Sequence, residues 1–410
     1  MPPAIAELVS LHGTARAVGR AFGAANGADI AAAVAAFFGG PWRRDTLLAS
    51  TERYRSLVAE HAPHWLDEAA GLAEAAGVAP EDYLAYQGAK YRQINLPECF
   101  SYCAAPRHTT GGVTLFHKNR DNAKRPQCAY VKEVEGFHRF AATADTMDLG
   151  CMMAVNAAGL CACADVGYPD PNPCFRGMMN PDIQRLILER CASVDAALAL
   201  LEELDGRRVY AGATTATNWL FTDAGGGMAQ VRHYHGRLEV NRSDEGFLVM
   251  RPDACGDLVL AAFRAESGHL RPALLNRLSR QAPILAASNI SAMTASVPAL
   301  RPDLFSRADF AVHHAGRAVY VPLYLGITAT PKPLLDGTLH RLADSRRVPV
   351  EALAAFEAGL HDQCGRLELA VRDALAKRGE EAARRTLTLG CARFAAATVR
   401  FLEQAEPRQP

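Results

Sequence analysis

The sequence predicts an α+β fold, a four-layer sandwich in which helices cover two central antiparallel sheets. Three observations predict it. Residues 1–95 have helical apolar spacing, the apolar period changes to two from Cys99 onward, and strand runs and helix runs then follow one another in long blocks. Such blocks favour stacked sheets over a βαβ alternation, which would build a parallel sheet.

The N-terminal segment is expected to be helical throughout. Alanine-rich helical patterns cover roughly 14–38 and 45–62, and Pro63 marks a break between helices. A third helix runs through HWLDEAAGLAEAAG, and a fourth begins near Pro80 with acidic residues in its first turn. We interpret residues 1–98 as a helical segment that covers another part of the chain.

Short strand candidates punctuated by glycine begin at Cys99. The first six are CFSYCAA, GVTLFH, YVKEVEG, FHRFAAT, CMMAVNAAG and LCACADVG. Residues 180–204 return to helix, in two pieces divided by a capping signal at Ser193. Four more strand candidates follow: TNWLFTD, MAQVRHYHG, RLEVNR and EGFLVMR. Strands of this kind in uninterrupted series are typical of antiparallel sheets.

The last third of the chain is predicted to be mostly helical. A helical zone is expected over about 257–296, after which FAVHHAGRAVYVPLYL forms a late hairpin that turns at Gly316. At least two amphipathic helices are expected in the C-terminal part, either as an annex or as an oligomer contact. The predicted organisation is a helical segment 1–98, a layered core 99–348 and a helical extension 349–410.

Composition excludes several classes of function. Forty-four basic residues balance forty-four acidic ones, and no long run of one sign is present, so we expect no nucleic-acid or anionic-lipid partner. The N-terminus lacks the basic flank and cleavage signature of a secretory signal, and we find no unbroken apolar window of membrane-spanning length. The chain is therefore predicted to be cytoplasmic, without a membrane partner.

The cysteines predict buried thiols rather than a metal or disulfide framework. Their number, eleven, is odd, their spacing is scattered and no CxxC pair is present. Cys161 and Cys163 would point to one face of a strand, with no histidine beside them. We expect no metal and no other cofactor. A thiol-rich redox or metal-binding protein stays open as a rival interpretation.

The stretch ECFSYCAAPRHTTGGVTLFHKNRD, residues 98–121, contains the best candidate nucleophile. Cys99 would head one strand and Asp121 would end the next, so a thiol and a carboxylate could meet across a hairpin. None of the thirteen histidines is a compelling base for the thiol. A cysteine exposed as a new N-terminus carries its own base, because a free α-amino group has a pKa of about 8.

Four segments in fixed order carry a family resemblance. They are LDEAAGLAEAAGVAPEDYLAYQ at 66–87, ECFSYC at 98–103, HKNRDN at 117–122 and MAVNAAGL at 153–160, with weaker support from TNWLFTDAGG at 217–226. Together they resemble the acyl-coenzyme A:6-aminopenicillanic acid acyltransferase group of autoproteolytic N-terminal-nucleophile hydrolases, which are related to the choloylglycine hydrolases. The likeness extends over roughly residues 50–340, and it implies the N-terminal-nucleophile form of the four-layer αββα sandwich.

The resemblance also implies roles for particular residues. Cys99 would be the cysteine freed by cleavage after Glu98, and Ser101 the hydroxyl two positions later. Asp121 would neighbour the new amine, and Asn156 would donate to the oxyanion. Further candidates for contacts with the substrate follow from the same comparison and from side-chain chemistry: Asn119, Asn218 and Arg307.

The sequence departs from the family pattern at four places. Glu98 stands where glycine is common, Lys118 where arginine or glutamine is found, and Arg120 where an aromatic or aliphatic residue is usual. The Thr-Asn element expected after a strand such as FLVM is replaced by residues 251–253, Arg-Pro-Asp.

The expected function is a cysteine N-terminal-nucleophile amidohydrolase or acyltransferase. It would act on an amide or acyl thioester of a small molecule, with water or an amine as acceptor. One alternative is a relative that is not processed, has no catalytic activity and binds a metabolite or a partner protein. A second leaves the fold unchanged but makes Cys103, on the same alternating strand, the nucleophile.

Overall fold

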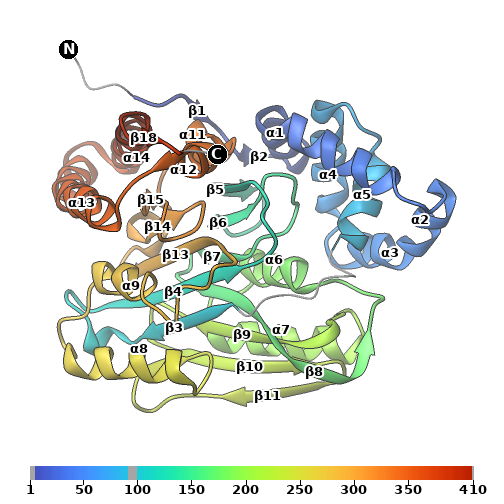
Figure 1. Cartoon of the computed structure of the whole chain (residues 1–410), viewed down its shortest axis with the longest axis horizontal. Coiled ribbons are helices and arrows are strands. Elements are labelled where there is room, and N and C mark those ends of the chain that lie inside the picture. Colours follow the sequence, from blue (N-terminus) through green and yellow to red (C-terminus); the bar gives the residue numbers. More distant parts are fainter. Residues whose placement is uncertain (1–4, 91–98, 409–410) are drawn as a thin grey trace.

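The computed structural model describes residues 5–90 and 99–408, and in it two antiparallel sheets lie one above the other between helices (Figure 1). This architecture confirms the predicted α+β four-layer sandwich. The larger sheet has eight strands, in the order β11 (Arg237–Asn241), β10 (Met228–Tyr234), β9 (Ala213–Thr222), β8 (Cys161–Cys174), β7 (Met153–Asn156), β6 (Phe140–Asp145), β5 (Gln127–Val134) and β2 (His12–Gly13). Strand β2 is parallel to β5, and the other neighbours are antiparallel.

The smaller sheet carries the candidate nucleophile. Its six strands are antiparallel, in the order β12 (Phe247–Val249), β3 (Phe100–Ala104), β4 (Val113–Asp121), β13 (Asn289–Pro298), β14 (Arg307–Ala311) and β15 (Val321–Tyr324). Two-stranded pairs join β1 (Leu8–Val9) to β16 (Thr330–Pro331), and β17 (Arg346–Arg347) to β18 (Glu406–Pro407).

Alternation along the strands explains why the sheets stack. On β8, Cys161 and Cys163 belong to the apolar cluster between the sheets, whereas Ala162 and Ala164 belong to the cluster on the outer face of the eight-stranded sheet. A period of two therefore gives each strand two buried faces. Burial of both faces is the reason that this sheet needs helices on one side and a second sheet on the other.

Helices cover both outer faces. On the eight-stranded side are α1 (Ala15–Phe38), α4 (His64–Ala76), α5 (Pro80–Ala89), α6 (Asn180–Arg190) and α7 (Val194–Gly206), with α2 (Arg44–Ser50) and α3 (Glu52–His61) beyond them. On the six-stranded side are α8 (Ala254–Ala265), α9 (Pro272–Leu278), α13 (Val350–Arg378) and α14 (Glu380–Glu403). Shorter elements complete the chain: η1 (Pro106–His108), α10 (Pro302–Phe305), α11 (Lys332–Leu335) and α12 (Thr338–Ser345).

Two predictions are wrong. The N-terminal segment is not helical throughout, because Leu8–Val9 and His12–Gly13 form strands β1 and β2 before the first helix. The helical zone expected over 257–296 contains α8 and α9, but residues 289–298 form β13, which lies between β4 and β14 in the six-stranded sheet. The run NISAMTASVP mixes β-branched residues such as Ile290, which favour strands, with residues such as Ala292, which favour helices, so pairing on both sides decides its conformation. The capping signal at Ser193 is confirmed, because its side chain accepts a hydrogen bond from the backbone N–H of Ala196 at the start of α7.

The N-terminal helices are held to the rest of the chain by buried charges. Glu68 on α4 is 1% exposed, and its carboxylate binds Lys132 of β5 at 2.7 Å and Arg185 of α6. Trp65 donates to Glu189 at 3.0 Å, next to the same arginine. Removing one partner of a buried charge pair typically costs about 3–5 kcal/mol. The N-terminal helices are therefore held to β5 and α6 by side-chain contacts that would remain if the chain were cut between them.

Helix α1 differs from the expectation that the chain contains no apolar stretch of membrane-spanning length. Among the described residues it is the one helix long and apolar enough, by length and composition, to cross a membrane. These two criteria are weak evidence, since core helices of other proteins also satisfy them. Here α1 packs tightly on α4: a methyl group at Gly19 would lie 2.0 Å from the carbonyl oxygen of Glu68, and one at Gly71 would lie 2.2 Å from that of Arg16.

Candidate active site

The hairpin that carries Cys99 and Asp121 is present. Strands β3 and β4 pair with Phe100 opposite Asn119, so Cys99, just before β3, lies beside the end of β4. The turn between the strands contains Gly111 and Gly112, both with positive φ. The Cys99 Sγ lies 3.8 Å from the carbonyl oxygen of Asp121, and the cysteine is 7% exposed. The two ends of the stretch therefore meet, as their sequence positions indicated.

A buried ion pair lies behind the thiol. Lys118 on β4 binds Asp165 on β8, with 2.9 Å between Nζ and Oδ1, and it also donates to the carbonyl oxygen of Ala164. Ser101, paired with Lys118 in the β3–β4 register, donates to the same carboxylate at 2.9 Å. Burial alone would lower the pKa of Lys118, but Asp165 outweighs it and holds that pKa above its ordinary value. Lys118 therefore keeps its charge next to Cys99.

The pKa of the Cys99 thiol is raised to about 11, because burial disfavours the thiolate. The charge of Lys118 opposes this effect, and the carboxylates of Asp165 and Asp121 add to it. At neutral pH the thiol is consequently protonated. A nearby group must take its proton before it can attack a carbonyl.

Asp121, whose backbone carbonyl oxygen lies 3.8 Å from the Cys99 Sγ, also carries a titratable carboxyl. Burial raises the pKa of this carboxyl to about 7, although a hydrogen bond from Asn289 lowers it in part. The Asn289 Nδ2 lies 3.3 Å from Asp121 Oδ1, and its Oδ1 accepts from the backbone N–H of Ala315 at 2.8 Å. Asn289 thus fixes the carboxyl against the end of β14. An acid with a pKa near 7 is half ionised at neutral pH and can accept or donate a proton.

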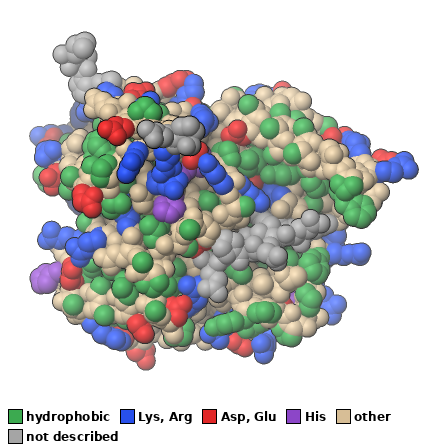
Figure 2. Space-filling view, viewed as in Figure 1, with side chains coloured by type: hydrophobic (Ala, Val, Ile, Leu, Met, Phe, Trp, Pro, Cys, Tyr) green, Lys and Arg blue, Asp and Glu red, His purple; other side chains and the backbone are tan. Residues whose placement is uncertain are grey.

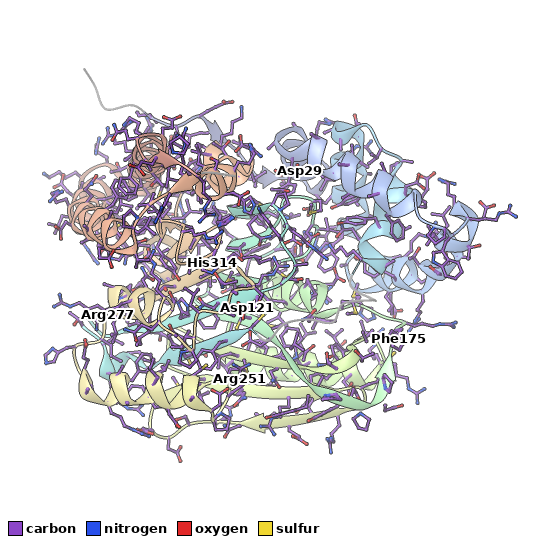
Figure 3. All side chains as sticks on the ribbon, viewed as in Figure 1. Asp29, Asp121, Phe175, Arg251, Arg277 and His314 are labelled. Carbon is purple, nitrogen blue, oxygen red and sulfur yellow. The ribbon has the colours of Figure 1, made fainter. Side chains whose placement is uncertain are left out.

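Two departures from the family pattern have structural explanations. Arg120 is buried and binds Asp145 of β6 across the two sheets, with 2.6 Å between Nη1 and Oδ1. Arg251, which stands in place of the expected Thr-Asn element, lies over the ring of Phe100 at 5.5 Å and donates to Asp253 at 2.9 Å. Arg120 is the residue before Asp121 on β4, and Arg251 acts on the Asp121 carboxyl through its charge; Figure 3 labels Arg251 and Asp121.

Asn218 lies in the same layer as the buried ion pair. It is directly opposite Asp165 in the β8–β9 register and is 4% exposed. Its Nδ2 donates to Val166 at 3.5 Å, and its Oδ1 has no hydrogen-bonding partner among the described residues. Asn218 and Ser101 are thus the predicted substrate contacts that the structure places near Cys99.

The role predicted for Asn156 needs correction. Its Nδ2 donates to the carbonyl oxygens of Leu188 and Cys191 at 2.9 and 2.7 Å, and its Oδ1 accepts from the N–H groups of Ala158 and Leu160. The side chain is fully buried on the outer face of β7, because its neighbour Val155 points between the sheets. Asn156 fastens the end of α6 and has no free donor for an oxyanion.

Two predicted substrate contacts also lie elsewhere. Asn119 is fully buried on the α9 side of β4, where it donates to the carbonyl oxygen of Ser279 at 2.9 Å. Arg307 binds Asp309 at 3.0 Å and pairs with Ser296, seven residues along β13 from Asn289. Seven strand residues span about 23 Å, so Arg307 lies at the opposite end of the sheet from Cys99.

All the other thiols except that of Cys174 are buried. Cys103 is fully buried between the sheets, and burial raises its pKa to about 12. Residues 5–90 and 99–408 contain no group of three His, Cys, Asp or Glu side chains arranged to hold a metal ion. Glu98, the residue before the predicted cleavage point, lies outside the described residues.

Sequence reasoning missed Asp165 and Asn289 and gave no role to Lys118. The sequence could have indicated Asp165, because it follows Cys161 and Cys163 at intervals of two on β8 and therefore lies on the same face of the strand. Asn289 had none, because its segment was predicted to be helical. Lys118 was noted only as a substitution for the usual residue, and the structure shows that it pairs with Asp165.

Comparison with known families gives one match in sequence. Residues 108–247 match the model of a family described as acyl-coenzyme A:6-aminopenicillanic acid acyltransferase, the family that the motifs indicated. The matched segment begins after Cys99 and includes Lys118, Asp121 and Asp165. No curated protein sequence matches the chain.

Solved structures give weak likenesses. An N-acylethanolamine-hydrolyzing acid amidase ortholog from Caenorhabditis elegans has a TM-score of 0.38 and 10% identity, over 50% of this chain and 93% of its own. Penicillin V acylase from Agrobacterium tumefaciens has a TM-score of 0.34 and 14% identity, over 53% of this chain and 86% of its own. A variant of conjugated bile acid hydrolase from Clostridium perfringens has a TM-score of 0.38 and 10% identity, over 52% of this chain and 89% of its own. At these TM-scores the likenesses assign no function to the chain.

Proposed function

Since residues 108–247 are a domain of the acyl-coenzyme A:6-aminopenicillanic acid acyltransferase family, we propose that the chain is a cysteine N-terminal-nucleophile amidohydrolase or acyltransferase. It acts on an amide or acyl thioester of a small molecule. The observation that carries the proposal is the meeting of Cys99, Asp121 and the Lys118–Asp165 pair at one end of the two stacked sheets.

Activation begins with the uncut chain. Ionised Asp121 takes the thiol proton, and the Cys99 Sγ attacks the carbonyl carbon of Glu98. The carbon–nitrogen bond of the peptide breaks, the proton passes to the departing nitrogen, and a thioester joins Glu98 to Cys99. The Cys99 amine is free from this point. Water then hydrolyses the thioester, which frees the Cys99 thiol and leaves Glu98 as a new C-terminal carboxylate.

The mature site works with the same residues in changed roles. The Cys99 amine, with a pKa of about 8, accepts the thiol proton directly or through a water molecule. Asp121 holds the resulting ammonium at the strand end. The thiolate attacks the substrate carbonyl and forms an acyl-enzyme, and water or an amine then accepts the acyl group.

Lys118 takes the role first predicted for Asn156. An ammonium group has three donors, and Asp165 and the carbonyl oxygen of Ala164 accept two of those of Lys118. The third donor is left for the oxygen that becomes negative when Cys99 attacks. In a site from which water is excluded, a fixed cation stabilises such an oxyanion more strongly than it would in solvent.

Purified wild-type protein is expected to show two fragments of 98 and 312 residues (410 − 98) in denaturing electrophoresis and intact mass spectrometry. The same sample should elute as one species in native size-exclusion chromatography, because Glu68 holds the N-terminal fragment through Lys132 and Arg185. A single uncut chain that turns over amides would refute the activation step. A single uncut chain that binds a metabolite without turnover would favour the non-catalytic alternative.

The rate of cleavage is expected to rise with pH and to level off above about 7. Asp121 must be ionised to act as the base, and burial raises its pKa to about 7. Cleavage can be timed by dilution of the denatured, uncut chain into buffers between pH 5.5 and 9. The Asp121→Asn variant should be cleaved at least tenfold more slowly. A wild-type rate that keeps rising tenfold per pH unit through pH 9 would point to direct ionisation of the thiol and contradict this role.

The same pKa shift affects stability in the uncut chain. The folded state raises the pKa of Asp121 above the unfolded value of about 3.9, so it favours the protonated carboxyl. That contribution is complete below about pH 3.9 and is lost as the pH rises through about 7. Asp121→Asn should remove this part of the pH dependence of the unfolding free energy. Urea unfolding at a series of pH values measures it, with Cys99→Ala compared with the double variant Cys99→Ala, Asp121→Asn, so that both chains stay uncut.

A further inference from the structure

A second polar cavity opens at the same end of the six-stranded sheet as Cys99. Its volume is about 200 Å³, and it lies where β4 ends, β13 begins and β14 ends. The lining side chains that matter here are Lys124, Asn289, His313, His314, Arg317 and His340. Figure 2 shows lysine and arginine side chains gathered around a histidine on this face, above the centre of the molecule. We call this cavity the histidine–arginine pocket.

The pocket contains polar groups without partners. His313 is 5% exposed, and its Nδ1 has no hydrogen-bonding partner among the described residues, while its Nε2 lies 3.4 Å from Asp344. The guanidinium of Arg317 likewise makes no hydrogen bond or ion pair within the described part of the chain. Buried polar atoms are normally satisfied, so the unpartnered Nδ1 of His313, a residue that lines the cavity, points to a missing partner.

The charges around the pocket favour an anion. Burial and the neighbouring Arg408 lower the pKa of Arg317, which means that the cation is poorly compensated where it lies. Burial and His340 also lower the pKa of His313, to about 3, so this ring is neutral in the absence of a ligand. Asp344, which lies 3.4 Å from the His313 Nε2, is already bound by Lys124 at 2.8 Å. A negative group would relieve the arginine and give a proton on His313 an acceptor.

The pocket is linked to the candidate active site by one side chain. Asn289 lines it and donates to Asp121, whose carbonyl oxygen lies 3.8 Å from the Cys99 Sγ. The strands from β3 to β14 are neighbours in the order β3, β4, β13, β14, so the pocket lies about 10–14 Å from the nucleophile across the strand ends. Figure 3 shows the labelled His314 and Asp121 at this end of the sheet. A small molecule can span this distance.

We propose that the histidine–arginine pocket binds an oxyanion group, a carboxylate or a phosphate, beside the Cys99 site. Arg317 supplies the charge and His313 the buried hydrogen bond. The group is either part of the substrate, which rests on the function proposed above, or a free anion. In the first case the pocket fixes the end of the substrate that does not react, and the carbonyl lies over Cys99.

Binding is tested first without turnover. Inorganic phosphate or acetate, at constant ionic strength, should raise the melting temperature of the wild-type protein and shift the NMR signals of His313. Arg317→Ala should weaken the affinity for phosphate at least tenfold. This variant should fold, because Arg317 is exposed. Arg385→Ala is the matched control, since Arg385 is an exposed arginine that pairs only with Glu381 in the described residues. Absence of phosphate and acetate binding in the wild type overturns the proposal.

Kinetics then identify the source of the anion. The wild-type protein is given an amide whose amine half carries a carboxylate, and the carboxamide analogue of that compound. A KM at least tenfold lower for the carboxylate than for the carboxamide, a preference that is lost in Arg317→Ala and kept in Arg385→Ala, assigns the pocket to the substrate. Equal KM values together with phosphate binding assign it to a free anion. Phosphate binding without turnover of any amide leaves the pocket in place and counts against the proposed function instead.

Discussion

Cys99→Ala is expected to produce one uncut chain of 410 residues with no measurable turnover of any amide. Alanine has no nucleophile for the carbonyl of Glu98, so the peptide bond stays intact and the amine that should serve as base is never freed. Intact mass spectrometry measures the first effect and an amide-cleavage assay the second. The loss should be complete, because the same atom is needed for activation and for every later catalytic cycle.

Cys103→Ala is the matched control for this variant. Cys103 has the same parity on the hairpin and is fully buried, but its thiol contacts the apolar layer between the sheets and no ionised group. We expect normal cleavage and a stability loss of about 1 kcal/mol from the missing sulfur. Normal cleavage of Cys99→Ala together with an uncut Cys103→Ala chain would transfer the nucleophile to Cys103.

Lys118→Met is expected to have the second largest effect. It leaves Asp165 buried with a negative charge and no cation, which should cost about 3–5 kcal/mol of the free energy of unfolding. It also removes the cation beside Cys99, so cleavage and amide turnover should fall by about 10²- to 10³-fold. Urea unfolding and the cleavage time course measure the two effects separately.

A double variant separates structure from catalysis. Lys118→Met with Asp165→Asn removes both charges, so much of the lost stability should return. If Lys118 stabilises the oxyanion, cleavage and turnover stay low in this refolded background. Recovery of activity together with stability would show that the ion pair only holds the sheets together, and would remove Lys118 from the mechanism.

The sequence predicted the hairpin well, because its pairing depends on nearby residues. The apolar period of two, the glycine pair at 111–112 and the polar residues at the end of the second strand predicted that Cys99 and Asp121 meet. The helices of the N-terminal segment and the Ser193 cap were also correct. The resemblance added the fold, and residues 108–247 match the model of the family that the motifs indicated.

Other site residues depend on contacts that no local pattern encodes. Asp165 reaches Lys118 only because β8 stacks on β4, and Asn289 reaches Asp121 only because residues 289–298 pair as a strand instead of continuing a helix. The oxyanion role predicted for Asn156 was wrong for the same reason. The alternation along β7 predicted which residues share a face with Asn156. It did not predict which of the two faces would pack against the other sheet.

The sequence by itself therefore determined the hairpin and the meeting of its two ends, the candidate nucleophile Cys99 and Asp121. The tertiary structure decided which charges surround the thiol and where a ligand's charged group can bind. The physical reason is that alternation along a strand is a local property, whereas the assignment of each face to core, helix or cavity depends on which strands pair and which sheets stack. Those contacts join residues that lie far apart in the chain, so they follow only from the fold as a whole.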